Sequence, residues 1–289
     1  MNRFIALQKI IEFGSFTKAA EALGYTQSSI SQMISSLEDE LSIKLLNRSR
    51  LGVKLTLEGV DLYPFIERTI LQYRATMEKA NEIKGLETGV IRIGTLASIS
   101  CHWMPQLIKE FQILYPNVEF ILHQGDYSSI QEWIKVGAVD FGFTTPAAVT
   151  GIETVYIKEG RMLAVLPENH KLASNSAVSL EEIANEPFIL LEEGHFSEPM
   201  EAFHACNLEP NIKFRIHDDY AIMTMVEAGL GISILAELVL RRTNYNIALL
   251  PINPPINRTL AIGYKDKSSL PIASKYFIEY LLNHVEMMP

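Results

Sequence analysis

The chain has 289 residues, of which 48% are apolar, so it is long enough for two or more domains with buried cores. It contains no run of about 18 apolar residues, and its first residues lack the pattern of a secretory signal. These features argue against a membrane-spanning or exported protein and predict a cytoplasmic one. Two cysteines do not form a disulfide framework, and no metal-binding spacing occurs, so neither a metal nor another cofactor is expected.

The charge is distributed unevenly along a chain whose net charge is -9. Residues 1–60 hold 7 Lys and Arg against 6 Asp and Glu, giving 7 - 6 = +1, and the other residues hold 18 against 28, giving 18 - 28 = -10. Residues 42–57 contain four basic side chains and no acidic one. This local basic patch indicates either a solvated charged turn or a contact with a polyanion such as DNA.

Three short helices are predicted in the first forty residues. An apolar stripe predicts a helix over about 2–13, which Gly14 ends. Ser15 or Thr17 can cap a second helix, whose inner face carries small alanines that allow another helix to approach closely. Thr26 can cap a third helix after a short turn. Two helices joined by a tight glycine turn are typical of a helix-turn-helix.

The third helix has an apolar face and a second face of short hydrogen-bonding side chains. Its apolar residues fall at helical spacing and predict a face toward the core. The second face is formed by Ser28, Ser31, Gln32 and Ser35. A helix that enters a DNA major groove needs donors and acceptors, because Gln pairs with adenine and Ser with several base edges. The face is therefore predicted to bind DNA, with an ordinary solvated face as the alternative.

A small hairpin, or wing, is predicted next. Its apolar residues are Leu45, Leu46, Val53, Leu55 and Leu57, and residues 49–52 form its tip. In this arrangement Arg48, Arg50 and Lys54 lie where a neighbouring phosphate or minor groove would be.

One long helix is predicted from Leu57 to about residue 84. Apolar residues recur along it alternately every three and four positions, as in a coiled-coil seam. The seam consists of Tyr63, Ile66, Ile70, Tyr73 and Met77. So long a helix with so narrow a seam favours a partner helix in a homodimer over packing on its own domain.

Strands and helices alternate through the last two hundred residues, which predicts parallel sheets covered on both faces. The number of strands predicts two α/β subdomains, the first formed by 89–161 with 265–289 and the second by 162–264. The chain would cross between them near Gly160–Arg161 and again near Gly263–Lys265.

Ligands of doubly wound sheets bind beyond the carboxyl ends of the strands. The residues predicted there are Ser98, Ser100, Gln124, Asp126, Thr144, Thr145, His195, Phe196 and Asp218. Ordinary loop capping is the alternative for each of them. Acidic side chains in these loops would repel a polyanion, which favours a neutral, zwitterionic or singly charged small molecule.

The segment 4–59 resembles the winged helix-turn-helix of LysR-type transcriptional regulators. It contains in order the patterns GSFTxAA, L-x-x-[ST]-Q-x-x-[IVL]-S, LE-x-x-L, L-F/L-x-R and LT-x-x-G. The resemblance implies contacts to bases or phosphates from Gln27, Ser28, Ser29, Ser31 and Gln32, with Arg50 as the wing arginine. Many members have proline and arginine where this chain has Ser28 and Gln32, which bears on the operator sequence.

The rest of the chain resembles the effector domain of the same regulators, through residues 90–95, 104–118 and 225–235. The implied fold is an N-terminal winged helix-turn-helix (1–58), a linker and dimerisation helix with its hinge (59–88), and an α/β effector domain built like a periplasmic binding protein. The implied function is sequence-specific regulation of transcription by a homodimer or homotetramer under control of a small-molecule effector. In the family the residue matching Ser98 often hydrogen-bonds the effector.

Other classes of protein would account for parts of the sequence. A solute-binding protein or an enzyme could use a two-lobed domain, but the chain has a DNA-binding head and lacks GxSxG, P-loop and dinucleotide motifs. A nucleoid-type DNA protein would sense nothing. The peroxide-sensing branch needs a thiolate after "GH", and Phe196 stands there. Cys101 and Cys206 are expected to be small buried side chains.

Overall fold

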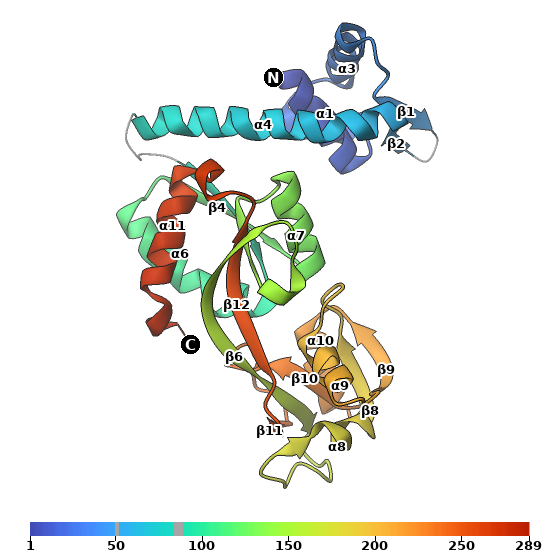
Figure 1. Cartoon of the computed structure of the whole chain (residues 1–289), viewed down its shortest axis with the longest axis vertical. Coiled ribbons are helices and arrows are strands. Elements are labelled where there is room, and N and C mark those ends of the chain that lie inside the picture. The colour runs from blue at the N-terminus through green and yellow to red at the C-terminus, as the bar shows by residue number, and fades with distance from the viewer. Residues whose placement is uncertain (50–51, 84–88, 289) are drawn as a thin grey trace. The chain divides into compact units, whose positions relative to one another are not determined.

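A computed structural model describes residues 1–49, 52–83 and 89–288. The chain divides into two compact units, Met1–Ala80 and Asn81–Pro289, and each is described by itself (Figure 1). Within the described residues, no helix combines the length and the apolar character that crossing a bilayer requires.

The first unit consists of helices and one small hairpin. Its elements are α1 (Asn2–Phe13), α2 (Phe16–Leu23), α3 (Gln27–Leu41), β1 (Leu46–Ser49), β2 (Gly52–Leu55) and α4 (Leu57–Ile83). The predicted helix boundaries are confirmed. Gly14 ends α1 with a φ of 60°, and the side chains of Ser15 and Thr26 accept backbone N–H groups as N-caps of α2 and α3.

The three short helices pack around a common core. Ala19, Ile30 and Ile34 are at most 1% exposed within it. The hairpin pairs β1 with β2 in antiparallel register, and the N–H of Val53 donates to the carbonyl of Gly14 at 3.2 Å. The wing is thereby fixed to the end of α1. Leu57 was predicted both in the hairpin and as the start of the long helix, and it is the first residue of α4, 85% exposed.

A buried carboxylate joins α3 to the start of the wing. Glu38 is 8% exposed, and its Oε1 accepts the N–H groups of Leu45 and Leu46 at 2.8 and 3.2 Å. Its Oε2 lies 2.8 Å from the Lys44 Nζ. Burial alone would raise the pKa of Glu38, but the Lys44 ammonium and the two amides outweigh it and hold that pKa below its ordinary value.

Glu38→Ala is expected to destabilise the first unit by about 2–3 kcal/mol, because two buried amides lose a charged acceptor. Since the pKa is lowered by folding, the contribution is present above the ordinary carboxyl pKa and is lost as the pH falls through the lowered one. Urea unfolding followed by helical circular dichroism at several pH values measures it. The exposed Glu40, whose carboxylate pairs with Arg3, is the matched control as Glu40→Ala. Equal effects of both substitutions would contradict this role of Glu38.

The linker helix α4 corrects the predicted seam. Ile66 and Ile70 are 3% and 0% exposed, and they lie in the core of the first unit rather than on a surface open to a partner. Tyr63 packs against the same core. The apolar periodicity indicates a stripe of buried residues. Such a stripe can pack against helices of the same chain or against a second copy, and the spacing does not distinguish the two. Tyr73 and Met77 continue the stripe and are 41% and 48% exposed.

The second unit contains one eight-stranded sheet, a two-stranded sheet and covering helices. The sheet order is β4-β3-β5-β12-β6-β11-β7, with β10 also paired to β6, and β8 pairs with β9. Its strands are β3 (Gly89–Thr95), β4 (Val118–Gln124), β5 (Phe141–Thr144), β6 (Glu153–Pro167), β7 (Val178–Ser179), β8 (Pro187–Leu191), β9 (Asn211–Ile216), β10 (Ser233–Ala236), β11 (Ile247–Asn253) and β12 (Asn257–Tyr264). Its helices are α5 (Ala97–His102), α6 (Met104–Leu114), α7 (Tyr127–Val136), η1 (Pro146–Ala148), α8 (Leu180–Ala184), α9 (Glu198–Ala205), α10 (Asp219–Glu227), η2 (Lys267–Ser269), α11 (Ile272–Asn283) and η3 (Val285–Met287).

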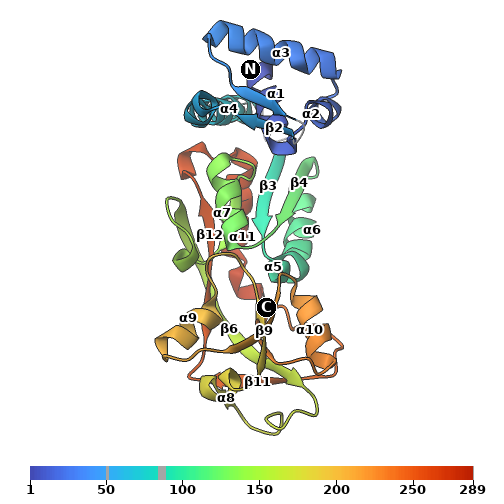
Figure 2. The ribbon, with the colours of Figure 1, turned by 90° about the vertical axis from the view of Figure 1, so that its right-hand side faces the viewer.

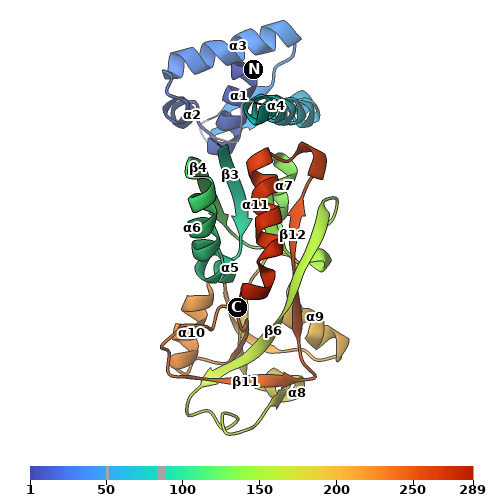
Figure 3. The ribbon, with the colours of Figure 1, turned by 90° about the vertical axis from the view of Figure 1, so that its left-hand side faces the viewer.

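The first subdomain has helices on both faces of its strands (Figures 2 and 3). On one face the rings of Phe111 in α6 and Phe277 in α11 pack edge to face, with their centroids 5.1 Å apart. On the other face α7 lies against two glycines, and a Cβ at Gly142 would come within 2.5 Å of the Ile130 side chain. The strands β3, β4 and β5 are parallel as predicted, whereas β12 is antiparallel to β5 and β6.

Two long strands, β6 and β12, connect the subdomains (Figure 3). The first half of β6 pairs with β12, and its second half pairs with β10 and β11. Leu260, Ile262 and Tyr264 belong to the core of the first subdomain, and Ile256 belongs to that of the second. The return crossing therefore lies near 256–258, and the predicted crossing at 263–265 is wrong. A continuous apolar run predicts a buried strand, but it does not indicate which of the two cores each residue of the strand belongs to.

Candidate functional site

The helix α3 lies at the outside of the first unit (Figure 2), and most of its polar side chains are exposed. Gln27, Ser28, Gln32 and Ser35 are exposed, and Ser29 and Ser31 are half-buried. The Thr26 hydroxyl is hydrogen-bonded to those of Ser28 and Ser29 at 2.9 and 2.8 Å, so these two serines also build the cap of the helix. The exposed glutamine amides point away from the core stripe and can donate and accept at once.

The wing adds positive charge beside this helix in the sequence. Asn47 pairs with Lys54 across the hairpin, and the Lys54 side chain is exposed. Arg50, predicted as the wing arginine, lies outside the described residues, as does the side chain of Arg48.

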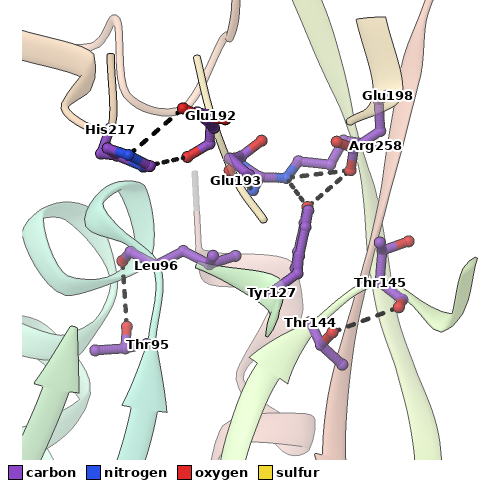
Figure 4. A network of polar contacts seen from close by, with 10 residues as sticks. All are labelled: Thr95, Leu96, Tyr127, Thr144, Thr145, Glu192, Glu193, Glu198, His217 and Arg258. Atoms are coloured by element: carbon purple, nitrogen blue, oxygen red, sulfur yellow. Dashed lines mark hydrogen bonds and ion pairs between the residues drawn. The ribbon is translucent and has the colours of Figure 1, made fainter. Parts of the chain in front are cut away.

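In the second unit, three of the predicted hydroxyl side chains are buried where β3 and β5 end, beside the buried Thr95. Ser98 is 4% exposed, Thr144 0% and Thr145 3%. Thr144 donates to the carbonyl of Thr145 at 3.4 Å (Figure 4). Among the described residues, neither the Ser98 nor the Thr145 hydroxyl has a hydrogen-bond partner. Ser98 and Ser100 lie in α5 rather than in the predicted loop, and the Ser100 hydroxyl donates to Thr95 at 3.2 Å.

Two other predicted residues have structural roles as helix caps. The Asp126 carboxylate accepts the N–H of Ser129 at 2.7 Å and begins α7. Asp218 accepts the N–H of Ala221 at 2.8 Å and begins α10. Gln124 is exposed at the end of β4, and its side chain forms no hydrogen bond with the buried hydroxyls in the described structure.

The loop after β8 brings the second subdomain against the first. The Ser128 hydroxyl lies 2.5 Å from the His195 Nδ1 and accepts the His195 N–H at 3.0 Å. Gly194 has a φ of +89°, and a Cβ there would lie 2.2 Å from the Ser128 Oγ. Phe196 packs against the first core. Glycine at 194 thus permits the close approach that brings His195 to the subdomain boundary.

A buried charge network, which the sequence interpretation missed, spans the same boundary (Figure 4). Arg258 is 5% exposed, and its Nε donates to the Tyr127 hydroxyl at 2.7 Å while its Nη2 donates to Glu193 at 2.8 Å. The Tyr127 hydroxyl donates to Glu198 Oε1 at 2.7 Å. Arg258 lies at the start of a crossing strand, Tyr127 begins α7, and the two glutamates belong to the second subdomain. The available signal was an arginine at the start of a strand whose later residues are mostly apolar.

The network carries more acid than base. Burial raises the pKa of Glu193 to about 7, against the opposing charge of Arg258, and the carboxylates of Glu198 and Asp219 raise it further. Burial also raises the pKa of Asp219. The Oε2 of Glu198 is enclosed without a partner among the described residues. The boundary between the subdomains is therefore short of hydrogen-bond donors and of positive charge.

The two cysteines differ from their prediction. Both Cys101 and Cys206 are exposed. Cys101 lies in the last turn of α5, and Cys206 follows the last residue of α9. The apolar character of cysteine predicted buried positions, but side chains at helix ends are more exposed to solvent than side chains in the core.

Comparisons with known proteins place the chain in a family. Residues 1–60 match the model of the bacterial regulatory helix-turn-helix protein of the lysR family, and residues 84–286 match the LysR substrate binding domain. The HTH-type transcriptional regulator YvbU of Bacillus subtilis, itself uncharacterised, is 32% identical over 274 residues, which are 94% of each chain.

Two solved structures share the fold along the whole chain. A variant of full-length OxyR from Pseudomonas aeruginosa has a TM-score of 0.74 at 22% identity and covers 99% of this chain and 93% of its own. Full-length CbnR in complex with its target DNA has a TM-score of 0.66 at 19% identity, over 98% of both chains. These likenesses confirm the predicted fold class. With a lysR-family helix-turn-helix followed by a LysR substrate binding domain, the chain belongs to the LysR family of transcriptional regulators.

Proposed function

We propose that the protein binds specific DNA sequences through α3 and the wing, as a cytoplasmic homodimer or homotetramer, and that a small molecule held between the subdomains of the second unit controls this binding. The observation that carries the DNA part is the exposed, uncharged hydrogen-bonding face of α3. Such a face is better suited to base edges, which are recognised by directional hydrogen bonds, than to phosphates, which are bound mainly by positive charge. Lys54, with Arg48 and Arg50, would supply the phosphate contacts.

Exposed apolar residues support self-association. Tyr73 and Met77 on α4 offer a short surface for a second copy. In the second unit Ile113 and Leu114 of α6 are 75% and 60% exposed, and Ile121 and Leu122 on β4, which ends the sheet, are 41% and 40% exposed. An open sheet edge with apolar neighbours is a frequent protein interface.

The hydroxyls of Ser98, Thr144 and Thr145 and the imidazole of His195 support an effector site at the ends of β3 and β5. The hydroxyls of Ser98 and Thr145 form no hydrogen bond with a described residue, so both can bind a ligand. The acid excess around Glu193 supports a neutral, zwitterionic or singly charged effector over a polyanion. We assign the unit a binding role without catalysis. CbnR, whose solved structure contains target DNA, supports the DNA part by its likeness in fold.

Gln27→Ala is expected to weaken binding to a specific operator by about 1–3 kcal/mol and to leave nonspecific binding nearly unchanged, because a bidentate base contact is lost and no charge is removed. Fluorescence anisotropy on operator and scrambled duplexes measures both. Gln72→Ala on α4, also exposed, is the control. Unchanged operator affinity of Gln27→Ala would show that α3 does not place this residue against a base.

For the effector, the full chain is screened by thermal shift against amino acids, aromatic acids, sugar phosphates and inorganic anions. A ligand at 100 times its dissociation constant is expected to stabilise the second unit by about 2.7 kcal/mol. Ser98→Ala should reduce its affinity about fivefold or more, since one buried hydrogen bond contributes about 1 kcal/mol. If the ligands found in the screen bind Ser98→Ala, Thr145→Val and the wild type with equal affinity, the effector site does not lie at these strand ends.

A further inference from the structure

A cavity of about 800 Å³ lies on the second unit, away from the strand-end site. Its walls come from the junction of α5 and α6, from residues 241–242 of the second subdomain, and from η3 with Met288. None of the residues predicted to bind the effector lines it. Its size falls in the range of about 300–1,000 Å³ that is usual for small-molecule sites.

Positive charge without a partner converges on this cavity. Arg241 and Arg242 line it, are exposed, and form no ion pair or side-chain hydrogen bond with any described residue. Arg161, on the crossing strand β6, is by contrast held by Glu237 at 2.9 and 3.0 Å. Arg242 also has a φ of 58°, a left-handed conformation that a residue other than glycine adopts at a cost. Two free guanidiniums stand out in a chain whose net charge is -9.

A third nitrogen in the cavity wall also lacks a partner. The Nε2 of His102 is enclosed and forms no hydrogen bond with a described residue. Burial, then the charges of Arg242 and Arg241, lower the pKa of His102. The nearby acids are Glu110, which already accepts from the Tyr280 hydroxyl at 2.8 Å and from Gln106, and Glu286. The two guanidiniums are therefore the donors in this wall that lack an acceptor among the described residues, while the His102 Nε2 donates or accepts according to the ring tautomer.

Apolar side chains form another part of the wall. Trp103 and Leu107 are 1% and 2% exposed, whereas Met287 is 71% exposed. A second cavity of about 330 Å³ shares Trp103 and Arg241 with the first and is also lined by Gly160 and Leu260 of the crossing strands. A molecule in the larger cavity would thus touch both subdomains next to the strands that join them.

We propose that this cavity is a second ligand site, which takes a small organic anion with its carboxylate or phosphate on Arg241 and Arg242 and its apolar body against Trp103 and Met287. Two guanidinium groups suit such a head group because each can donate two parallel hydrogen bonds to it. By contacting both subdomains, the bound anion favours one relative position of the two. The site is independent of the strand-end effector site and of DNA binding.

The test uses the full chain and three probes of one length: hexanoate, hexyl phosphate and the neutral hexanamide. Isothermal titration is expected to show at least one anion binding about tenfold or more tightly than the amide, a difference of about 1.4 kcal/mol. The comparison of the two anions separates a carboxylate ligand from a phosphate ligand. The double variant Arg241→Gln/Arg242→Gln should lose at least about tenfold in affinity for the better anion. Arg215→Gln, an exposed arginine on β9, and Ser98→Ala should not.

A second measurement uses the cysteines, since Cys101 lines the cavity and Cys206 does not, while both are exposed. Saturating anion should slow the alkylation of Cys101 by neutral iodoacetamide and leave that of Cys206 unchanged, as followed by peptide mass spectrometry. Equal binding of amide and anions, full affinity in the double variant, or unprotected Cys101 at saturation would each overturn the proposal. Loss of affinity in Ser98→Ala alone would assign the anion to the strand-end site instead.

Discussion

Arg258→Met is expected to destabilise the second unit by about 3–5 kcal/mol near pH 8, because it leaves the buried Glu193 and Glu198 without their cation. Arg258 and Glu193 have side chains that are 6% and 11% exposed, so water cannot replace the lost partner. The Tyr127 hydroxyl also loses a donor at 2.7 Å. Methionine restores much of the volume, so the loss is electrostatic rather than a cavity.

The effect depends on pH with a defined sign. In the wild type the pKa of Glu193 is raised by folding to about 7, so the stability associated with it is fully present below the ordinary carboxyl pKa and is lost as the pH rises through 7. Without Arg258 the opposing charge that lowers this pKa is gone, and the pKa rises further. The destabilisation is therefore expected to be smaller near pH 5.5 than near pH 8.

Tryptophan fluorescence during urea unfolding measures this directly, because both tryptophans, Trp103 and Trp133, belong to the second unit. The control is Arg161→Met, which removes an arginine of a crossing strand from an exposed ion pair and should leave the stability nearly unchanged. Similar losses in the two variants, or a loss at pH 5.5 as large as at pH 8, would mean that the Arg258 network does not hold the subdomains together.

Ile70→Asp is expected to unfold the first unit rather than only to separate two copies. Ile70 is 0% exposed in its core, and a carboxylate there costs more than about 4 kcal/mol, which is comparable with the whole stability of a small domain. Helical circular dichroism should fall and DNA binding should be lost. Tryptophan fluorescence should stay as in the wild type, because the second unit remains folded.

The exposed neighbour Thr69, changed to aspartate, is the control and should leave the first unit folded. A folded, monomeric Ile70→Asp that keeps its helicity would show that this residue faces a second copy, as its spacing predicted. Dimerisation itself is tested separately with Tyr73→Asp and Met77→Asp, whose side chains are exposed.

Local signals made the first unit predictable from sequence. Side-chain caps begin α2 and α3 at Ser15 and Thr26, and Gly14 and Gly24 end α1 and α2. Each of the three helices also has an apolar stripe. These signals act between neighbours in the chain and need no knowledge of the fold. The alternation of strands and helices likewise predicted the class of the second unit.

Long-range contacts were not predictable in the same way. The spacing of Ile66 and Ile70 is the same whether the stripe packs into the core of its own unit or against a partner helix. The Arg258 network joins residues that lie 131 and 65 positions apart in the chain, and no local spacing brings them together. The first half of β6, residues 153–161, offers no such signal, because its residues are mostly exposed or half-buried and form no apolar run.

The measurement that tests the central claim most directly is capture of genomic DNA fragments by the full chain at about 150 mM salt, followed by sequencing, for the wild type and for Gln27→Ala/Gln32→Ala. Nonspecific binding is weak at this salt, so retained fragments report sequence preference. We expect the wild type to retain a small set of fragments that share a two-fold symmetric motif, and the double variant to lose them. Fragments without a common motif, or the same set for both proteins, would contradict sequence-specific recognition through α3.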